Sequence, residues 1–180
     1  ISQEQIIALL EAARWAPSCF GDQPWRFIVW DKNADAAAWQ KAFDCIVPGN
    51  QAWVKDAPLL LLTMAGSLFN HNGKENRWGQ YDTGAAAENL CLQASSMGLM
   101  AHQMGGFDGA KAREAFSIPA EYTPMAMMSV GYPADVATLN GEVLQRGSVL
   151  GQVRPSSPAL LDARSHDDAA ARLASAVAHQ

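Results

Sequence analysis

The sequence predicts a single α/β or α+β domain built around one central sheet. Three observations lead to this prediction. Helix-like and strand-like patterns alternate along the chain, no internal repeat or linker divides it, and a chain of 180 residues normally forms one domain. The composition is 49% hydrophobic and 17% charged, which is typical of a globular protein with a full core.

The first predicted element is a helix that begins after Ser2. Ser2 and Gln5 have the spacing of a capping box, in which two side chains satisfy free backbone N–H groups at a helix start. Pro17 cannot continue a helix, so the element should end before it. The apolar residues in between fall on one helical face, namely Ile6, Ile7, Leu9, Leu10 and Ala13.

Short apolar runs predict the strands. The run from Leu59 to Met64 is continuous and begins after Pro58, which indicates a strand buried on both faces. Three further runs bounded by turn residues are also predicted as strands: Phe27 to Trp30, Met100 to Gln103 and Met125 to Val130.

Further helices are predicted between these strands and at the end of the chain. Asp108 can cap a helix that runs to Phe116, and Gly98 is a typical helix end for a long apolar segment. Residues 134 to 164 contain no convincing element. The predicted segments are Ala34 to Phe43, Asp82 to Met97, Asp108 to Phe116 and, weakest in pattern, Asp167 to Ala178.

Two segments are interpreted as turns or loops. Pro48, Gly49 and Asn50 are common turn residues, so a turn is expected there. Gly66 to Gly79 is polar and long enough for a functional loop. Phe69 and Asn70 in this loop are candidates for the border of a substrate pocket, although a solvated loop explains them equally well.

Bulk properties argue against several classes of function. The formal net charge of −5 argues against nucleic acid as the main partner. Three distant cysteines and four histidines without ligand spacing argue against disulfides and a metal site. No apolar run approaches the length of a membrane span, so we expect no membrane partner. The scattered cysteines fit a reducing compartment, so we expect a cytoplasmic protein.

Sequence motifs for direct side-chain catalysis or dinucleotide binding are also absent. The chain has no GxGxxG after a strand, no GxxxxGK[ST] and no GxSxG elbow. An enzyme with this sequence therefore has no obvious catalytic side chain, and we assign none. That situation is expected when a bound cofactor performs the chemistry.

Four segments carry most of the functional signal. The first joins the first helix to the first strand, and its prolines and Gly21 would shape a loop that a ligand can approach. In order, the segments read ARWAPS with QPWRF (13–18 and 23–27), GNQAW (49–53), YDTGAAAENL (81–90) and HQMGGF (102–107). Together and in this order they resemble the nitroreductase family over residues 1–133.

The resemblance implies a fold and a cofactor. The implied fold is α+β with three layers, in which helices flank a central mixed sheet. Residues 1–180 would form one domain, of which 135–180 is an atypical tail. The resemblance also implies a homodimer that binds FMN in a groove between its two copies, with NADH or NADPH as co-substrate.

The resemblance further assigns cofactor-binding residues. Pro17, Ser18 and Phe20 match a loop that contacts the flavin ring and ribityl chain. Asn50 matches an amide that bonds the pyrimidine edge. Gly105 matches a position whose backbone N–H points at flavin N5, and the residues around it are Gln103, Met104 and Gly106.

Ordinary structural roles explain the same residues without a ligand. Ser18 could cap a turn and Asn50 could be a turn residue. The Gly105-Gly106 pair could form a simple turn after a strand. His102 is more often a packed histidine than a catalytic acid.

The sequence departs from the family pattern at both ends. The family's arginine segment for the FMN phosphate would lie before Ile1. The family's C-terminal basic pair is not recognisable, so Arg146 and Arg154 are only candidates for phosphate binding.

The resemblance thus predicts an FMN-dependent oxidoreductase that passes a hydride from NAD(P)H to a small acceptor such as a nitroaromatic, quinone or enone. The alternative is a non-catalytic flavin-binding protein on the same fold. A more distant alternative is a family member with other FMN chemistry, such as reductive dehalogenation or flavin fragmentation.

Overall fold

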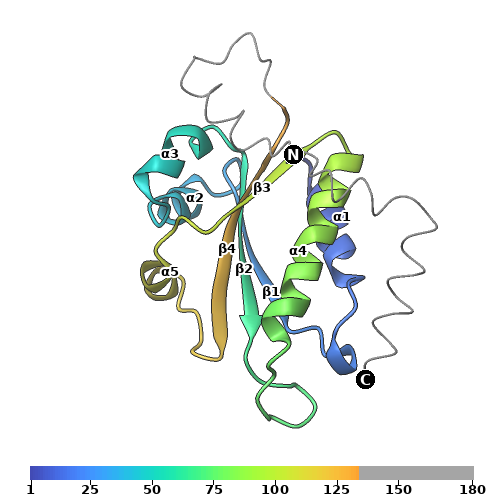
Figure 1. The fold of residues 1–180 in the computed structure, drawn as a ribbon. Coiled ribbons are helices and arrows are strands. Elements are labelled where there is room, and N and C mark those ends of the chain that lie inside the picture. The colour runs from blue at the N-terminus through green and yellow to red at the C-terminus, as the bar shows by residue number, and fades with distance from the viewer. Residues whose placement is uncertain (134–180) are drawn as a thin grey trace, which may run out of the picture. The chain divides into compact units, whose positions relative to one another are not determined.

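A computed structural model describes residues 1–133 of the chain (Figure 1). The predicted helix from Asp167 to Ala178, the candidates Arg146 and Arg154 and the tail at 135–180 lie outside the described residues. The assignment of residues 1–180 to one domain therefore stays a prediction. Within the described residues, no helix combines the length and the apolar character needed to cross a membrane.

A four-stranded sheet forms the middle layer. Its strands are β1 (Trp25–Asp31), β2 (Leu59–Gly66), β3 (Met100–Met104) and β4 (Tyr122–Gly131), in the spatial order β1-β2-β4-β3. Every residue of β2 is buried, as its continuous apolar run predicts. β4 lies between β2 and β3 and runs antiparallel to both, so β2 and β3 point the same way and α4 connects them.

The expected α+β class with flanking helices is confirmed, but the expectation of a mixed sheet differs from the pairing observed. All three strand pairs within residues 1–133 are antiparallel. The reason is that β4 inserts between the two like-directed strands and separates them, so β2 and β3 never pair directly.

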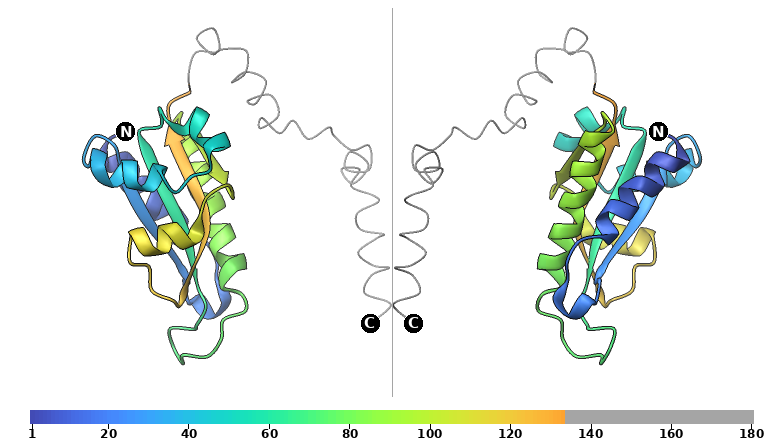
Figure 2. Two further views of the ribbon diagram at one scale, coloured as in Figure 1. Left: turned by 90° about the vertical axis from the view of Figure 1, so that its left-hand side faces the viewer. Right: turned by 90° about the vertical axis from the view of Figure 1, so that its right-hand side faces the viewer.

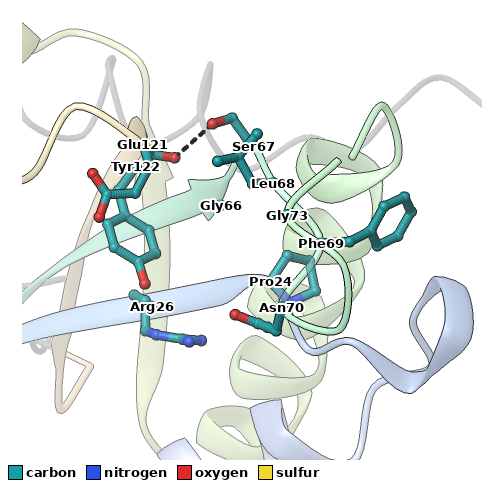
Figure 3. Close-up of a pocket in the computed structure, with 10 residues that line it drawn as sticks. All are labelled: Pro24, Arg26, Gly66, Ser67, Leu68, Phe69, Asn70, Gly73, Glu121 and Tyr122. Carbon is teal, nitrogen blue, oxygen red and sulfur yellow. Dashed lines mark hydrogen bonds between the residues drawn. The ribbon is translucent and has the colours of Figure 1, made fainter. Parts of the chain in front are cut away.

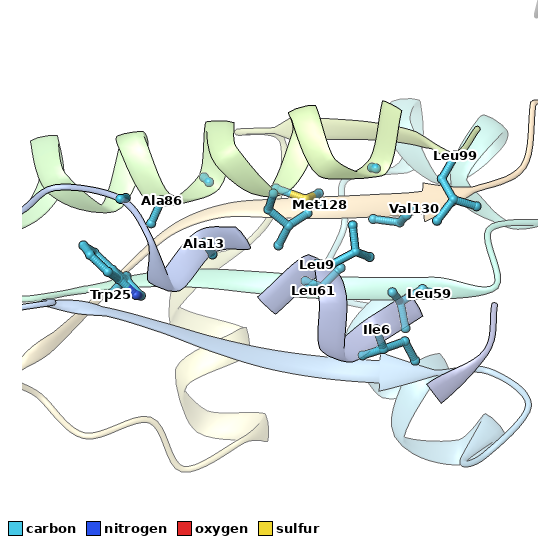
Figure 4. Packing of buried hydrophobic residues seen from close by; sticks show 14 residues of the cluster. Ile6, Leu9, Ala13, Trp25, Leu59, Leu61, Ala86, Leu99, Met128 and Val130 are labelled. Carbon is cyan, nitrogen blue, oxygen red and sulfur yellow. The ribbon is translucent and has the colours of Figure 1, made fainter. Parts of the chain in front are cut away.

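Two helices cover one face of the sheet. They are α1 (Gln3–Arg14) and α4 (Gly79–Ser96), which lie side by side in Figure 1. Asn89 of α4 donates from Nδ2 to the carbonyl of Ala12 at 3.2 Å. Figure 4 shows the apolar layer between these helices and the sheet. Leu9, Leu61 and Met128 belong to this layer and are fully buried.

Three shorter helices cover the other face. They are α2 (Ala36–Phe43), α3 (Pro48–Val54) and α5 (Gly109–Ala115), and Figure 2 shows them from two further sides. Their core contains Trp39, stacked on Phe43 with ring centroids 5.1 Å apart. Leu60, Leu62 and Met127 pack into this core from the sheet. The alternation of β2 side chains between two apolar cores makes the sheet the middle of three layers.

Most predicted element positions are confirmed, with three corrections. Ser2 and Gln5 form the expected capping box. Ile7, expected on the buried face of α1, is instead 57% exposed, because it lies at the edge of the apolar stripe. The long helix begins at Gly79 rather than Asp82. The expected turn at Pro48 is the start of α3, since proline at the first helical position lacks only an N–H that would be unpaired there.

Candidate functional site

The loop between α1 and β1 holds Pro17, Ser18 and Phe20 in a constrained conformation. A single helical turn, Cys19–Gly21, occupies its middle. Phe20 and Gln23 both have positive φ, at 57° and 50°. Backbone of this kind costs about 1–3 kcal/mol per non-glycine residue and persists only where surrounding contacts hold it. Such strain is concentrated at functional sites, so the loop is a sound candidate for one.

One buried carboxylate anchors this loop to the neighbouring helix. Asp82, in the first turn of α4 and only 5% exposed, accepts a hydrogen bond from the backbone N–H of Cys19 at 2.9 Å. Ser18 Oγ closes the loop from within by accepting the N–H of Gln23 at 3.0 Å. Asp82 was not predicted as a positioning residue, although it stands inside the YDTG segment.

A second carboxylate joins the same loop to the segment between β2 and α4. The Asp22 side chain, 2% exposed, accepts the Asn70 backbone N–H at 2.9 Å and faces His71 Nδ1 at 3.5 Å. The rings of Phe20, Phe69 and His71 then lie 5.2–5.7 Å apart in edge-on and tilted pairs. Phe20 is 81% exposed, so this aromatic group presents a face to solvent.

The remaining predicted residues meet at the end of β3. Asn50, in the first turn of α3, donates from Nδ2 to the carbonyl of Gly106 at 3.3 Å. The same carbonyl accepts the N–H of Val47 at 3.0 Å, and an isolated bridge joins Ile46 to Phe107. A Cβ on Gly106 would overlap Asn50 Nδ2, so glycine lets Asn50 keep this position and its bond to the Gly106 carbonyl.

Gly105 and its neighbours differ in which of their backbone and side-chain groups are exposed. Gly105 is exposed, has no atom within 4 Å of a Cβ position, and its N–H has no hydrogen-bond partner among residues 1–133. Met104 is 5% exposed with its side chain in the core, so only its backbone could face a ligand. Gln103 donates from Nε2 to Cys91 Sγ at 3.6 Å. The resemblance assigns the Gly105 N–H to flavin N5, and that role stays a prediction.

His102 packs against Trp53 and is not placed as a catalytic acid. Its ring meets the Trp53 ring edge-on at 4.8 Å, and burial lowers the pKa of His102 below its ordinary value. A histidine in this state is neutral near pH 7, which favours the packing role over a catalytic one.

This pKa direction predicts a pH effect on stability. Because the folded pKa lies below the unfolded value of about 6.5, the unfolded chain binds the proton first as pH falls, and folding weakens below that value. We expect the free energy of unfolding to fall more between about pH 7.5 and 5.5 in the wild type than in His102→Gln. Denaturant titrations at each pH measure the free energy of unfolding of the wild type and of His102→Gln. Equal slopes in the two proteins would contradict the assignment.

The two groups of predicted flavin residues lie at opposite edges of the sheet. Pro17, Ser18 and Phe20 precede β1, the strand at one edge. Asn50, Gly105 and Gly106 gather at the end of β3, the strand at the other edge. Helices cover both faces between them (Figure 2). Within one copy, the structure therefore does not bring the two groups together.

Phe69 and Asn70 line a cavity, and their predicted role at the border of a substrate pocket stays a prediction. The cavity has a volume of about 230 Å³ and opens where β2 ends and β4 begins (Figure 3). Arg26 and Tyr122 line its other side. Sequence reasoning found no role for Arg26, because nothing local to QPWRF marks it as a binding residue.

Comparison with known proteins gives the same family over the same residues. The nitroreductase family model matches residues 1–132. A Methanothermobacter thermautotrophicus protein, provisionally named NADH dehydrogenase/NAD(P)H nitroreductase, is 32% identical over 139 residues, or 75% of this chain and 69% of that protein. An Archaeoglobus fulgidus protein with the same name is 31% identical over 139 residues, or 75% of this chain and 76% of that protein.

Solved structures agree with this likeness. A crystal structure described as an oxidoreductase containing FMN has a TM-score of 0.74 and 31% identity, covering 81% of this chain and 74% of that one. A Desulfovibrio desulfuricans protein, provisionally named a nitroreductase and solved in complex with FMN, has a TM-score of 0.62 and 27% identity. That match covers 75% of this chain and 76% of the other.

Proposed function

Because the chain belongs to the nitroreductase family, we propose that it is an FMN-dependent oxidoreductase that uses NADH or NADPH to reduce a small electron acceptor. Nitroaromatics, quinones and enones are the proposed acceptors. The observation that carries the proposal is the exposed N–H of Gly105, which has no partner among residues 1–133 and lies near the Asn50 amide that bonds Gly106. Two relatives with nitroreductase names and two FMN-containing structures support it.

The residues at the end of β3 are chemically suited to a flavin ring. A planar ring with nitrogen and carbonyl acceptors needs backbone or amide donors and close access to the backbone. The Gly105 N–H supplies a donor, and the open space at its Cβ position leaves room for a ring. Within the described part of the chain Asn50 uses only its Nδ2, for the Gly106 carbonyl, so Oδ1 has no partner there. Bound FMN would take a hydride from NAD(P)H and pass electrons to the acceptor.

We propose further that two copies of the chain build each site. One copy would supply Asn50 and Gly105, and the other would supply the loop with Pro17, Ser18 and Phe20, because these groups lie at opposite edges of one sheet. A second copy would also cover four large exposed side chains on or beside α1 and α4. They are Ile7, Trp15, Tyr81 and Leu92.

An absorbance spectrum tests the proposed function. The purified chain is incubated with FMN, desalted, and measured before and after NADH or NADPH is added without oxygen. We expect retained flavin bands that bleach with the nicotinamide, followed by recovery when a nitroaromatic or quinone is added. The control is the Gly105→Pro variant, which removes the N–H donor.

The other outcomes separate the alternatives. Flavin that stays bound but does not bleach would favour a non-catalytic flavin-binding protein. Bleaching with release of a fragmented flavin or a halide would indicate different FMN chemistry. Absence of any retained flavin would contradict the proposal for this chain.

A further inference from the structure

The cavity beside Asn70 has the size and lining of a site for a single-ring ligand. Its volume is about 230 Å³, and a cavity of about 150 Å³ already holds benzene. Pro24, Leu68 and the ring of Tyr122 provide apolar walls (Figure 3). There is therefore room for one ring with a small substituent.

Arg26 offers this cavity a fixed hydrogen-bond donor. Its Nη1 donates to the carbonyls of Gln23 at 3.0 Å and Trp25 at 2.7 Å, and its guanidinium carbon lies 5.6 Å from the centre of the Tyr122 ring. These three contacts hold the planar group in place. Its Nε and Nη2 have no partner and it has no carboxylate partner among residues 1–133, so one edge can donate to a ligand.

Asn70 offers a fixed hydrogen-bond acceptor. Its Nδ2 donates to the Asp22 backbone carbonyl at 2.9 Å and to Asp22 Oδ2 at 3.2 Å. Both Asp22 atoms can only accept, so the amide nitrogen must face them and Oδ1 must face away. In Figure 3 the side chains of Asn70 and Arg26 point toward each other across the cavity.

We propose that this cavity binds an aromatic ring carrying a primary carboxamide. The amide oxygen would accept from the free edge of Arg26, the amide nitrogen would donate to Asn70 Oδ1, and the ring would lie against Tyr122 and Leu68. A carboxylate is disfavoured, because Asn70 Oδ1 offers no proton to a second oxygen and Glu121, a residue of the cavity lining, adds negative charge nearby. This site uses none of the candidate flavin residues, so the carboxamide proposal and the proposed FMN-dependent function can fail separately.

Two sources could provide such a group. One is the nicotinamide ring of the co-substrate, and the other is a separate acceptor that carries a carboxamide. The chemistry recognised is the same in both cases. Titrations with nicotinamide and with NADH, next to one with benzamide, distinguish the sources.

Ligand-observed NMR on the full chain without FMN tests the proposal, with benzamide and benzoate as the probes. We expect saturable benzamide binding with a dissociation constant of about 1 mM, as is usual for a ligand with so few atoms. Benzoate should bind at least about tenfold more weakly. Equal binding of both probes, or no saturable benzamide binding, would overturn the proposal.

Three variants assign the binding to this cavity. Arg26→Met should weaken benzamide at least about tenfold, because it removes the donor of a charge-assisted bond. Glu121→Gln keeps the backbone carbonyl that Ser67 uses and should strengthen benzoate relative to benzamide. The matched control is Arg77→Met, whose guanidinium lies over Trp78 and outside the cavity, and it should bind benzamide like the wild type.

A folding defect in Arg26→Met would not hide the result. Circular dichroism shows whether Arg26→Met is folded. Glu121→Gln changes only an exposed carboxylate and tests the site without altering Arg26. If Glu121→Gln leaves the preference for benzamide over benzoate unchanged and Arg77→Met weakens binding as much as Arg26→Met does, the proposal is wrong. If NADH competes with benzamide, the co-substrate is the source, and if it does not, a separate acceptor is.

Discussion

We expect Gly79→Ala to lower the free energy of unfolding by about 3 kcal/mol or more, at the upper end of the range for overpacked sites. Gly79 is the first residue of α4 and is buried against the end of β2. A Cβ there would overlap the backbone carbonyl oxygen of Gly66, which cannot turn away as a side chain can. Because Gly66 is held by its N–H bond to Pro24 at 2.8 Å, the start of α4 would have to shift.

Gly109→Ala is the matched control for this change. Gly109 is also the first residue of a helix, but a Cβ there would meet only ordinary contacts at 3.7 and 3.9 Å. We expect its free energy of unfolding to stay within about 0.5 kcal/mol of the wild type. Thermal denaturation should then show a midpoint lower by about 6–12 °C for Gly79→Ala alone. Similar midpoints for the two variants would refute the overlap argument.

Gly106→Ala should have the largest effect on flavin binding, with a loss of affinity of at least about tenfold. A Cβ on Gly106 would overlap Asn50 Nδ2 and lie 3.0 Å from Val47 Cγ2. Asn50 can rotate away at a modest cost in stability. It would then lose its bond to the Gly106 carbonyl and the orientation proposed for the flavin edge. Fluorescence titration with FMN measures the change.

A double-mutant cycle identifies Asn50 as the group that responds. In an Asn50→Ala background the overlap is gone, so adding Gly106→Ala should cost little further affinity. Gly105→Ala controls for added bulk, because no atom lies within 4 Å of its Cβ position, and its thermal midpoint should match the wild type. If Gly106→Ala weakens FMN equally with and without Asn50, the mechanism is wrong.

Local signals in the sequence predicted most of the elements. The capping box at Ser2 and Gln5 and the continuous run at Leu59 to Met64 each depend on neighbouring residues, and both are confirmed. The α3 helix was missed because seven residues starting with Pro48 and Gly49 are too short for a periodic pattern. The flavin roles proposed for Asn50 and Gly105 came from the family resemblance and stay predictions.

Contacts between distant residues were beyond sequence reasoning. Asp82 bonds Cys19 across 63 positions, and Asp22 bonds Asn70 across 48. Neither aspartate stands out locally, because an aspartate near a helix start or a turn has ordinary explanations. Their roles emerge only when the fold brings the loop before β1 against α4 and the segment after β2.

By itself, the sequence determined most of the helices and strands, the burial of β2 and the family, since these depend on short-range patterns and on ordered motifs. The tertiary structure alone decided the strand order β1-β2-β4-β3. That order separates Ser18 from Gly105 to opposite edges and leaves a cavity between Arg26 and Asn70. The physical reason is that strand order is set by long-range packing of two apolar cores on one sheet, which no local stretch of sequence encodes.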